Sequence, residues 1–250
     1  MMIKAIGFDL FNTLLVAHPE TLEVATKRLL DALCSNGLTL DPMRFLELHK
    51  AKAVYYIKES QLTGRETHNS LWISAALKEL GYQLEPNSPL IESAVEAYFS
   101  AFYDLVKVIP GTHAFLEELK SSFKLALVSN FTHYPACQRL LEILNLLPYF
   151  DFCLISGKFG FRKPHPSVFQ AMCEALEVEP GQTAFVGDDL ESDIHGALNA
   201  GLKAVWTSYV MDHNLPFAPG YVHTQVGPED VPAPRISSWH ELRGLIKEWA

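Results

Sequence analysis

The sequence predicts an α/β protein with a parallel sheet at its core and an inserted helical domain. Short apolar runs alternate with amphipathic segments along residues 108–207, which is typical of a parallel sheet covered by helices through right-handed crossovers. Another apolar run near the N-terminus precedes a long stretch with helical periodicity and no strand pattern. We therefore expect a core domain of residues 1–16 and 106–250, and a separate four-helix domain of residues 17–105.

The first apolar run, residues 3–8, ends at Asp9 and is followed by the turn residues Asn12 and Thr13. A short apolar run bounded by a turn signal is typical of a strand buried on both faces. Ligands of parallel sheets bind beyond the carboxyl ends of the strands, where Asp9 would lie. A lone Asp after a strand is more often a cap or turn residue than a catalytic residue. A catalytic role for Asp9 therefore depends on whether polar residues also follow the later strands.

The inserted domain contains four segments with apolar residues at helical spacing. Glycines follow the first and third segments, and Asp-Pro or Ser-Pro pairs precede the second and fourth, as expected for helix ends and starts. Four consecutive helices of this kind predict a small bundle. The predicted helices cover residues 22–33, 43–60, 69–80 and 89–102.

The alternation of strands and helices restarts near Val108. Proline and glycine mark residues 212–235 as an irregular loop. The predicted strands cover residues 125–128, 152–156, 183–186 and 204–207. The predicted helices cover residues 112–121, 135–144, 166–176, 192–200 and 239–249.

Composition argues against several classes of protein. The chain has 250 residues, of which 48% are hydrophobic and 20% charged, so it can bury a substantial core. A formal net charge of −9 argues against a nucleic-acid partner or an anionic membrane surface, because both attract Lys and Arg. No apolar run is long enough to span a membrane, and the N-terminus lacks the features of a signal peptide. Four widely spaced cysteines, expected to be free and buried, favour the reducing cytoplasm: Cys34, Cys137, Cys153 and Cys173.

Four motifs place polar groups at one edge of the predicted sheet. They are residues 8–14 (FDLFNTL), residues 127–130 (LVSN), Lys163-Pro164, and residues 186–189 (VGDD) with Asp193. In order and spacing, these motifs resemble those of the haloacid dehalogenase superfamily of hydrolases, and the likeness extends from residue 3 to about residue 208. The resemblance implies a Rossmann-like core, and the helical insert resembles the α-helical, C1-type cap of that family.

The resemblance implies a chemical role for each motif. Asp9 would be the nucleophile that forms an aspartyl-phosphate. Lys163 would offset the negative charge that gathers between Asp9 and the substrate phosphate. With nearby backbone N–H groups, the phosphoryl oxygens would be bound by Thr13, Ser129 and Asn130.

The same resemblance implies Mg²⁺ as the cofactor. Mg²⁺ takes hard oxygen ligands from few carboxylates when a substrate phosphate completes its coordination. Asp193 would hold a metal-bound water or Lys163, and Asp189 is expected to cap the following helix. The implied metal residues are Asp9, Phe11 through its backbone carbonyl, Asp188 and Asp193.

Phe11 is where the chain departs from the phosphatases of this family. Their residue two beyond the nucleophile is a second Asp, which protonates the leaving group and then activates water. An acid-base group of this kind contributes a factor of about 10²–10⁴ in rate. The side chain of Phe11 can neither protonate the leaving group nor activate water. His18 or His133 could supply the missing proton transfer, and a substrate with a good leaving group would lessen the need for it.

An aromatic residue at this position favours the dehalogenase branch of the family, in which Asp9 would attack carbon and need no metal. Against that branch, Asp188 and Asp193 are both present. The cap of dehalogenases also carries an Arg that binds the substrate carboxylate. No Arg of this sequence clearly corresponds to it, although Arg44 and Arg65 are candidates. A phosphonatase-like reaction would need a Schiff-base lysine, for which the insert offers Lys50, Lys52 and Lys58.

We therefore predict a Mg²⁺-dependent, phosphatase-type hydrolase of a small phosphorylated metabolite that is slow on simple monoesters. The alternative enzyme is a 2-haloacid dehalogenase-like hydrolase. A third alternative is a weakly catalytic protein that binds phosphate and metal in a regulatory role. Magnesium dependence separates the first two, and stoichiometric phosphate binding without turnover would indicate the third.

Overall fold

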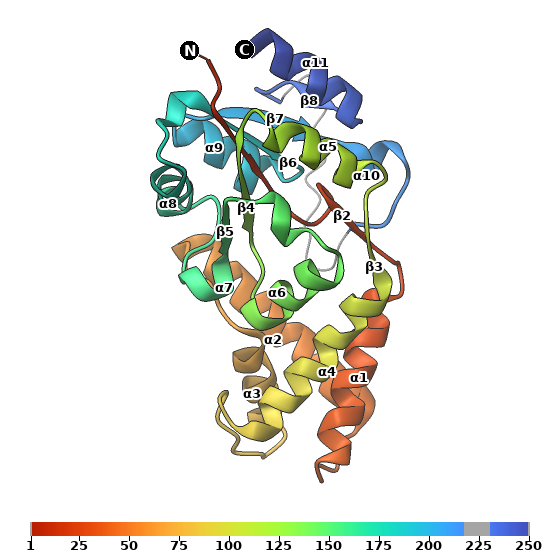
Figure 1. Ribbon diagram of the computed structural model, residues 1–250. Helices are drawn as coiled ribbons and strands as arrows, with labels where there is room; N and C mark the ends of the chain where they lie inside the picture. Colours follow the sequence, from red (N-terminus) through yellow and green to blue (C-terminus); the bar gives the residue numbers. More distant parts are fainter. Residues whose placement is uncertain (1, 218–230, 250) are drawn as a thin grey trace.

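The computed structural model describes residues 2–217 and 231–249, and a six-stranded sheet lies at its centre (Figure 1). The strand order is β5-β4-β1-β6-β7-β8, and every neighbouring pair is parallel. The predicted α/β fold class is confirmed. The strands are β1 (Ala5–Phe8), β4 (Lys124–Ser129), β5 (Phe152–Ile155), β6 (Thr183–Gly187), β7 (Lys203–Thr207) and β8 (Arg235–Ile236).

Alternate residues of the sheet face two separate hydrophobic clusters. In β4, Leu125 and Leu127 belong to one cluster, and Ala126 and Val128 belong to the other, because successive side chains of a strand point to opposite faces. Both faces are covered, so the strands appear in the sequence as continuous apolar runs. The first cluster includes residues of α5 (Thr112–Lys120), α6 (Tyr134–Ile143) and α11 (Trp239–Trp249), and the second includes residues of α8 (Pro166–Leu176) and α9 (Gly196–Asn199).

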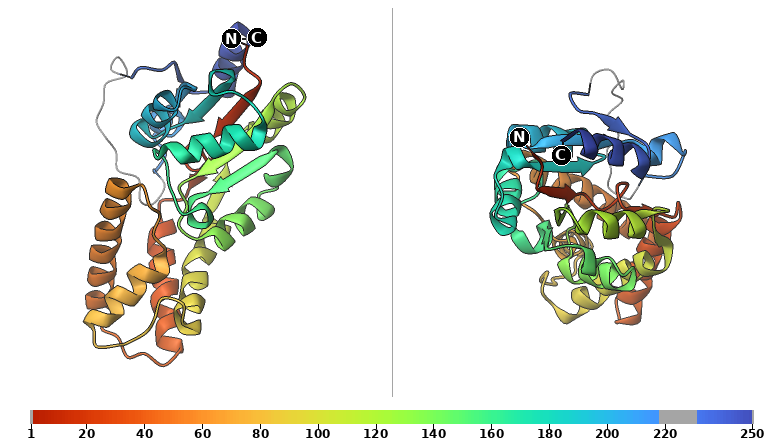
Figure 2. Two further views of the ribbon diagram at one scale, coloured as in Figure 1. Left: turned by 90° about the vertical axis from the view of Figure 1, so that its left-hand side faces the viewer. Right: turned by 45° about the horizontal axis from the view of Figure 1, so that its top comes forward.

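Four helices form the helical insert, which lies below the sheet in Figure 1 and in the left view of Figure 2. Their bounds agree closely with the helices predicted from apolar spacing. Asp41 caps the second helix as predicted, because its side chain accepts a hydrogen bond from Arg44 N at 2.8 Å. The helices are α1 (Thr21–Ser35), α2 (Pro42–Thr63), α3 (Asn69–Glu79) and α4 (Pro89–Leu105).

The chain enters and leaves the helical insert through a two-stranded antiparallel ribbon. β2 (Leu15–Ala17) pairs with β3 (Val106–Val108) outside the main sheet. The alternation expected to restart near Val108 therefore begins with a ribbon strand, and the sequence pattern missed β2. Strands of three residues are too short to show the two-residue period on which such a prediction depends.

The helix predicted over residues 192–200 begins earlier and has a different form. Leu190–His195 is a π-helix, and α9 follows it directly. Asp189 starts this segment: its side chain accepts from Ser192 N at 2.6 Å, and its carbonyl accepts from Ile194 N at 3.2 Å, which is the five-residue spacing of a π-turn. The helix-capping role expected of Asp189 is confirmed. π-turns are rare in proteins overall, and those that occur are often at functional sites.

The cysteines differ in exposure. Cys137 and Cys173 are buried and Cys153 is half-buried, but Cys34 is exposed. The expectation of four buried thiols is therefore wrong at Cys34, which lies on the solvent side of α1 near its C-terminal end.

The loop predicted over residues 212–235 is described in part. Residues 213–217 and 231–234 form no helix or strand, and residues 218–230 lie outside the described residues. Within the described part of the chain, no helix is both long and apolar enough to cross a membrane. Short elements complete the described chain: η1 (Leu147–Tyr149), α7 (Ser156–Phe159), η2 (Pro180–Gln182) and α10 (Tyr209–Asp212).

Candidate active site

The parallel register brings the predicted site residues to one edge of the sheet. Phe8, at the end of β1, is level with Leu127 of β4 and Val186 of β6. The carboxyl ends of these three neighbouring strands therefore meet at the same edge. The polar residues at this edge are Asp9, Ser129 and Asp188.

Lys163 supplies the positive charge of the site. Its side chain is 1% exposed, and its Nζ lies 2.6 Å from Asp9 Oδ1 and 2.7 Å from Asp193 Oδ1. Burial alone would lower the pKa of Lys163, but the charges of Asp193 and Asp9 together outweigh burial and raise it. The ammonium group is therefore charged and held between two carboxylates.

Asn130 holds the backbone of Lys163. Its Nδ2 donates to Lys163 O at 2.9 Å, and its Oδ1 accepts from Lys163 N at 2.8 Å. A side-chain amide can do both because it has a donor and an acceptor side by side. The side chain that was expected to bind phosphate thus ties the loop after β4 to the loop carrying Lys163.

Three carboxylates gather around Lys163. Asp9, Asp188 and Asp193 each offer an oxygen, and these atoms all lie within 4.8 Å of one another. Burial, followed by the charges of Asp9 and Asp193, raises the pKa of Asp188 well above its usual value. Burial also raises the pKa of Asp193 to about 7, although Lys163 opposes the shift. The cluster therefore has an excess of negative charge that a further cation would offset.

The donor atoms of this cluster fit Mg²⁺, which prefers oxygen ligands from carboxylates. Asp193 already has a protein partner on each oxygen: Oδ1 pairs with Lys163, and Oδ2 accepts from Asp189 N at 3.1 Å. Asp193 is therefore better suited to orienting Lys163 or a metal-bound water than to direct ligation.

The turn after Asp9 carries two polar side chains. Thr13 Oγ1 is buried and has no hydrogen-bond partner among the described residues. Because buried polar atoms are nearly always hydrogen-bonded, this hydroxyl fits the phosphate-binding role expected of Thr13. Asn12 has a φ of 61°, which Asn tolerates better than most residues, and its Nδ2 donates to Asp188 Oδ2 at 3.0 Å. Sequence reasoning treated Asn12 as a turn residue and missed its contact with Asp188.

Two residues beside Asp188 support the acidic cluster and were not predicted to do so. Trp206 of β7 donates from its indole N–H to the backbone carbonyl of Asp188 at 3.1 Å. At Gly187, a Cβ would lie 2.3 Å from Asp193 Oδ2. Glycine at this position therefore gives Asp193 the room to reach Lys163. A glycine directly before the Asp pair was the signal available in the sequence, whereas nothing local marks Trp206.

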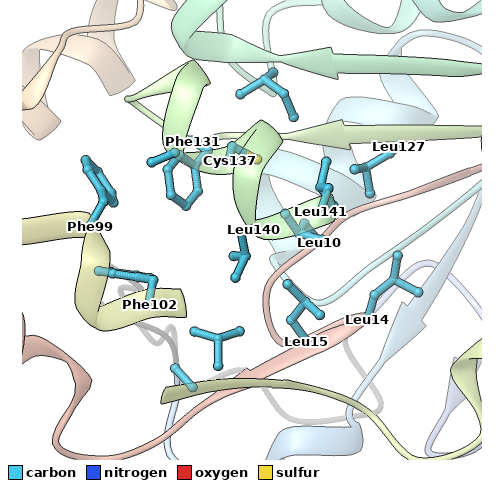
Figure 3. Close-up of a cluster of buried hydrophobic side chains, with 14 of the residues drawn as sticks. Leu10, Leu14, Leu15, Phe99, Phe102, Leu127, Phe131, Cys137, Leu140 and Leu141 are labelled. Carbon is cyan, nitrogen blue, oxygen red and sulfur yellow. The ribbon is translucent and has the colours of Figure 1, made fainter. Parts of the chain in front are cut away.

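Phe11 lies at the contact between the sheet edge and the helical insert. Its ring stacks on Phe131 with 5.9 Å between centroids, and it meets the ring of Phe102 edge-on at 6.1 Å. Figure 3 shows Phe99 and Phe102 on α4 and Phe131 on the opposite side of this contact. The half-buried Phe11 side chain therefore packs two parts of the molecule together.

The two histidines considered for proton transfer have other contacts. His18 is exposed, and its Nδ1 accepts from Glu20 N at 3.3 Å. His133 Nε2 lies 2.8 Å from Glu96 Oε1, and its ring stacks on Phe99. Among the described residues, neither histidine has a hydrogen bond to the acidic cluster.

The cationic residues of the insert are partnered or exposed. Arg44 and Lys52 pair with acidic residues of the insert, and the guanidinium of Arg65 lies over an aromatic ring of the core at 5.3 Å. Lys50 and Lys58 are exposed. A Schiff-base lysine needs burial that lowers its pKa, and none of these three lysines is buried.

Comparison with known proteins identifies a matching family model and similar sequences. A family model described as haloacid dehalogenase-like hydrolase matches residues 3–201. The chain is 29% identical over 209 residues to glyceraldehyde 3-phosphate phosphatase of Pyrococcus abyssi, covering 83% of this chain and 82% of that protein. It is 42% identical over 117 residues to human N-acylneuraminate-9-phosphatase, covering 45% of this chain and 47% of that protein.

Among solved structures, the chain is similar to 2-haloacid dehalogenase from Pseudomonas syringae pv. Tomato. The TM-score is 0.72 at 23% sequence identity, and the match covers 100% of both chains. At this level of identity the likeness shows a shared fold.

Proposed function

The chain belongs to the haloacid dehalogenase-like hydrolases, and from that premise we propose that it is a Mg²⁺-dependent phosphatase of a small phosphorylated metabolite. The observation that carries the proposal is the buried group of Asp9, Asp188 and Asp193 around Lys163. Three carboxylates near one ammonium group favour the binding of a divalent cation. The dehalogenase reaction, in which Asp9 would attack carbon, would not need such a cation. Two relatives named as phosphatases support the same reaction class.

Asp9 is the proposed nucleophile. Lys163 holds Oδ1, which leaves Oδ2 to attack phosphorus. The new oxygen–phosphorus bond forms as the bond to the leaving oxygen breaks, and the leaving oxygen takes its proton from solvent because Phe11 has none to give. Water then attacks phosphorus, and the aspartyl-phosphate separates into inorganic phosphate and the Asp9 carboxylate.

The other residues of the site stabilise charge and hold groups in place. Lys163 stabilises the negative charge shared between the nucleophile and the phosphoryl group. Thr13 and Ser129 are proposed to donate hydroxyl hydrogen bonds to phosphoryl oxygens. Mg²⁺ would neutralise part of the phosphate charge. Its proposed ligands are Asp9, Asp188 and the backbone carbonyl of Phe11, and Asp193 is proposed to orient Lys163 or a metal-bound water.

The helical insert, residues 17–105, is the proposed cap over a core of residues 1–16 and 106–250. Its α4 places Phe99 and Phe102 against Phe131, beside the catalytic edge of the sheet (Figure 3). A cap in this position would exclude water from the site and present side chains to the substrate.

The second candidate function is the 2-haloacid dehalogenase reaction, which is favoured by the aromatic residue Phe11. A panel of phosphate esters and 2-haloacids, each assayed with Mg²⁺ and with a chelator, separates the candidates. We expect phosphate release that requires Mg²⁺ and is faster for nitrophenyl and acyl phosphates than for alkyl esters. Halide release without Mg²⁺ would establish the dehalogenase, and phosphate binding without turnover would indicate a regulatory protein.

Mg²⁺ affinity should depend on the carboxylates in a definite order. Asp188→Asn is expected to remove measurable binding, and Asp193→Asn to weaken it by about tenfold, as for a group acting through other ligands. Asp189→Asn is the matched control, because Asp189 is adjacent but caps a helix. Calorimetry with beryllofluoride, which stands in for the phosphoryl group on Asp9, measures the three affinities. Equal losses in all three variants would contradict the assignment of Asp188 as a ligand.

A further inference from the structure

Glu66 is a charged residue of the helical insert whose side chain is buried and which the proposed mechanism does not use. It lies in the loop between α2 and α3, and its side chain is 1% exposed. Its Oε1 accepts from Arg162 Nη1 at 3.3 Å and from Thr67 N at 2.9 Å, and its Oε2 accepts from Ser156 Oγ at 2.6 Å. Glutamate is rarely this buried unless it is paired, and Arg162 and Ser156 belong to the core.

The backbone around Glu66 is also bonded to the core. Glu66 N donates to Gly160 O at 3.0 Å, and Arg162 N donates to Gly64 O at 2.9 Å. The approach is close, since a Cβ at Gly64 would lie 2.7 Å from the ring of His165. Figure 1 shows the C-terminal end of α2 beside α7. The loop of the insert is therefore seated on core residues 160–165.

Both core partners of Glu66 lead directly to the catalytic loops. Arg162 immediately precedes Lys163. Ser156 Oγ accepts from Phe131 N at 2.9 Å, and Phe131 follows Asn130, whose side chain holds the backbone of Lys163. One carboxylate of the insert thus connects the turn after β4 with the loop that carries the catalytic lysine.

We propose that Glu66 is a positioning residue of the hydrolase. Its carboxylate, seated in the core, holds Arg162 and the turn at Phe131 in the arrangement in which Lys163 reaches Asp9. Lys163 is then correctly placed only when the insert is seated on the core, so seating of the insert and the chemical step are coupled. The role in catalysis rests on the proposed function of Asp9 and Lys163.

Glu66→Gln tests the proposal, because it keeps the shape of the side chain and removes the charge that Arg162 binds. We expect kcat to fall by about tenfold or more while KM changes by less than about threefold, since Glu66 acts on the transition state through Lys163 and does not contact substrate. The matched control is Glu96→Gln, which alters another polar contact between insert and core, at the surface-exposed pair with His133. It should change kcat by less than about twofold.

Amide hydrogen exchange gives a measurement that does not depend on activity. In Glu66→Gln, the amides of residues 129–131 and 160–163 should exchange about tenfold faster or more, with β6 and α5 unchanged. If Glu66→Gln folds poorly, Gly64→Ala perturbs the same contact with Glu66 intact, through a strained φ of +70° and the approach to His165. It should give the same pattern.

The outcomes separate the two proposals. A wild-type protein inactive on the whole panel would count against the proposed function, while the exchange data would still decide whether Glu66 orders the two loops. A raised KM with unchanged kcat would overturn the positioning role in favour of a substrate contact. Unchanged exchange at both loops, or equal effects of Glu66→Gln and Glu96→Gln, would also overturn it.

Discussion

In an Asp9→Asn variant, hydrolysis should fall by roughly three orders of magnitude or more, the scale seen when a covalent nucleophile is removed. The amide has nearly the same shape as the carboxylate, and its oxygen can still accept from Lys163. Lys163 also keeps its pair with Asp193. The substitution removes one of three mutually repelling carboxylates, because the charge of Asp9 is among the causes that raise the pKa of Asp188 and Asp193. We therefore expect a melting temperature, measured without Mg²⁺, that is unchanged or higher.

The combination of lost activity and retained stability is the diagnostic result. Initial rates on the best ester of the panel and thermal melts are measured together for Asp9→Asn, with Asp189→Asn as the control outside the cluster. Full activity in folded, mass-verified Asp9→Asn protein would rule out the covalent mechanism. A large loss of stability would instead show that the Asp9–Lys163 pair holds the fold, contrary to the repulsion argued from the acidic cluster.

The architecture could be predicted because its signals are local and repeated. The run of residues 125–128 is apolar throughout, since its alternate side chains enter different hydrophobic clusters on the two faces of the sheet. The position of Asp9 at the edge follows from strand direction alone, because all neighbouring strands are parallel. Helix starts at Pro42 and Pro89 were marked by the Asp-Pro and Ser-Pro pairs, although only Asp41 accepts a capping hydrogen bond and Ser88 accepts none.

The contacts that the sequence did not reveal join residues far apart in the chain. Trp206 binds the carbonyl of Asp188 from the neighbouring strand, and Glu66 reaches Ser156 and Arg162 from the helical insert. Single residues of this kind leave no periodic pattern. They are fixed by the three-dimensional packing of elements, which propensity and spacing do not encode.

Asn130 shows how a motif can place a residue correctly and leave its contact open. The motif located it at the sheet edge, but its amide faces the backbone of Lys163. Which of several polar neighbours an amide binds depends on distances of a few tenths of an ångström. The sequence sets the order of residues along the chain and not these distances.

Phe11→Asp should accelerate the hydrolysis of alkyl phosphates, because it supplies the general acid that the proposed mechanism lacks. A positioned acid contributes about 10²–10⁴ in rate, and we expect a gain of at least about tenfold. The full factor is not expected, because the substitution removes the ring that packs on Phe131 and Phe102 and so loosens the contact with the insert. The new carboxyl near Asp9 should have a raised pKa, as expected for like charges in one site, which keeps it protonated and able to donate.

The leaving-group dependence decides whether Asp at position 11 acts as an acid. Poor leaving groups need a proton in the transition state and good ones do not, so the gain should be large for alkyl esters and small for nitrophenyl esters. Phe11→Asn is the matched control: it also removes the ring and adds a polar group, but it cannot protonate a leaving oxygen. If Phe11→Asp and Phe11→Asn behave alike across the ester series, the effect comes from lost packing. A gain confined to Phe11→Asp and to poor leaving groups would show that the lack of an acid to protonate the leaving group limits the rate of the native chain.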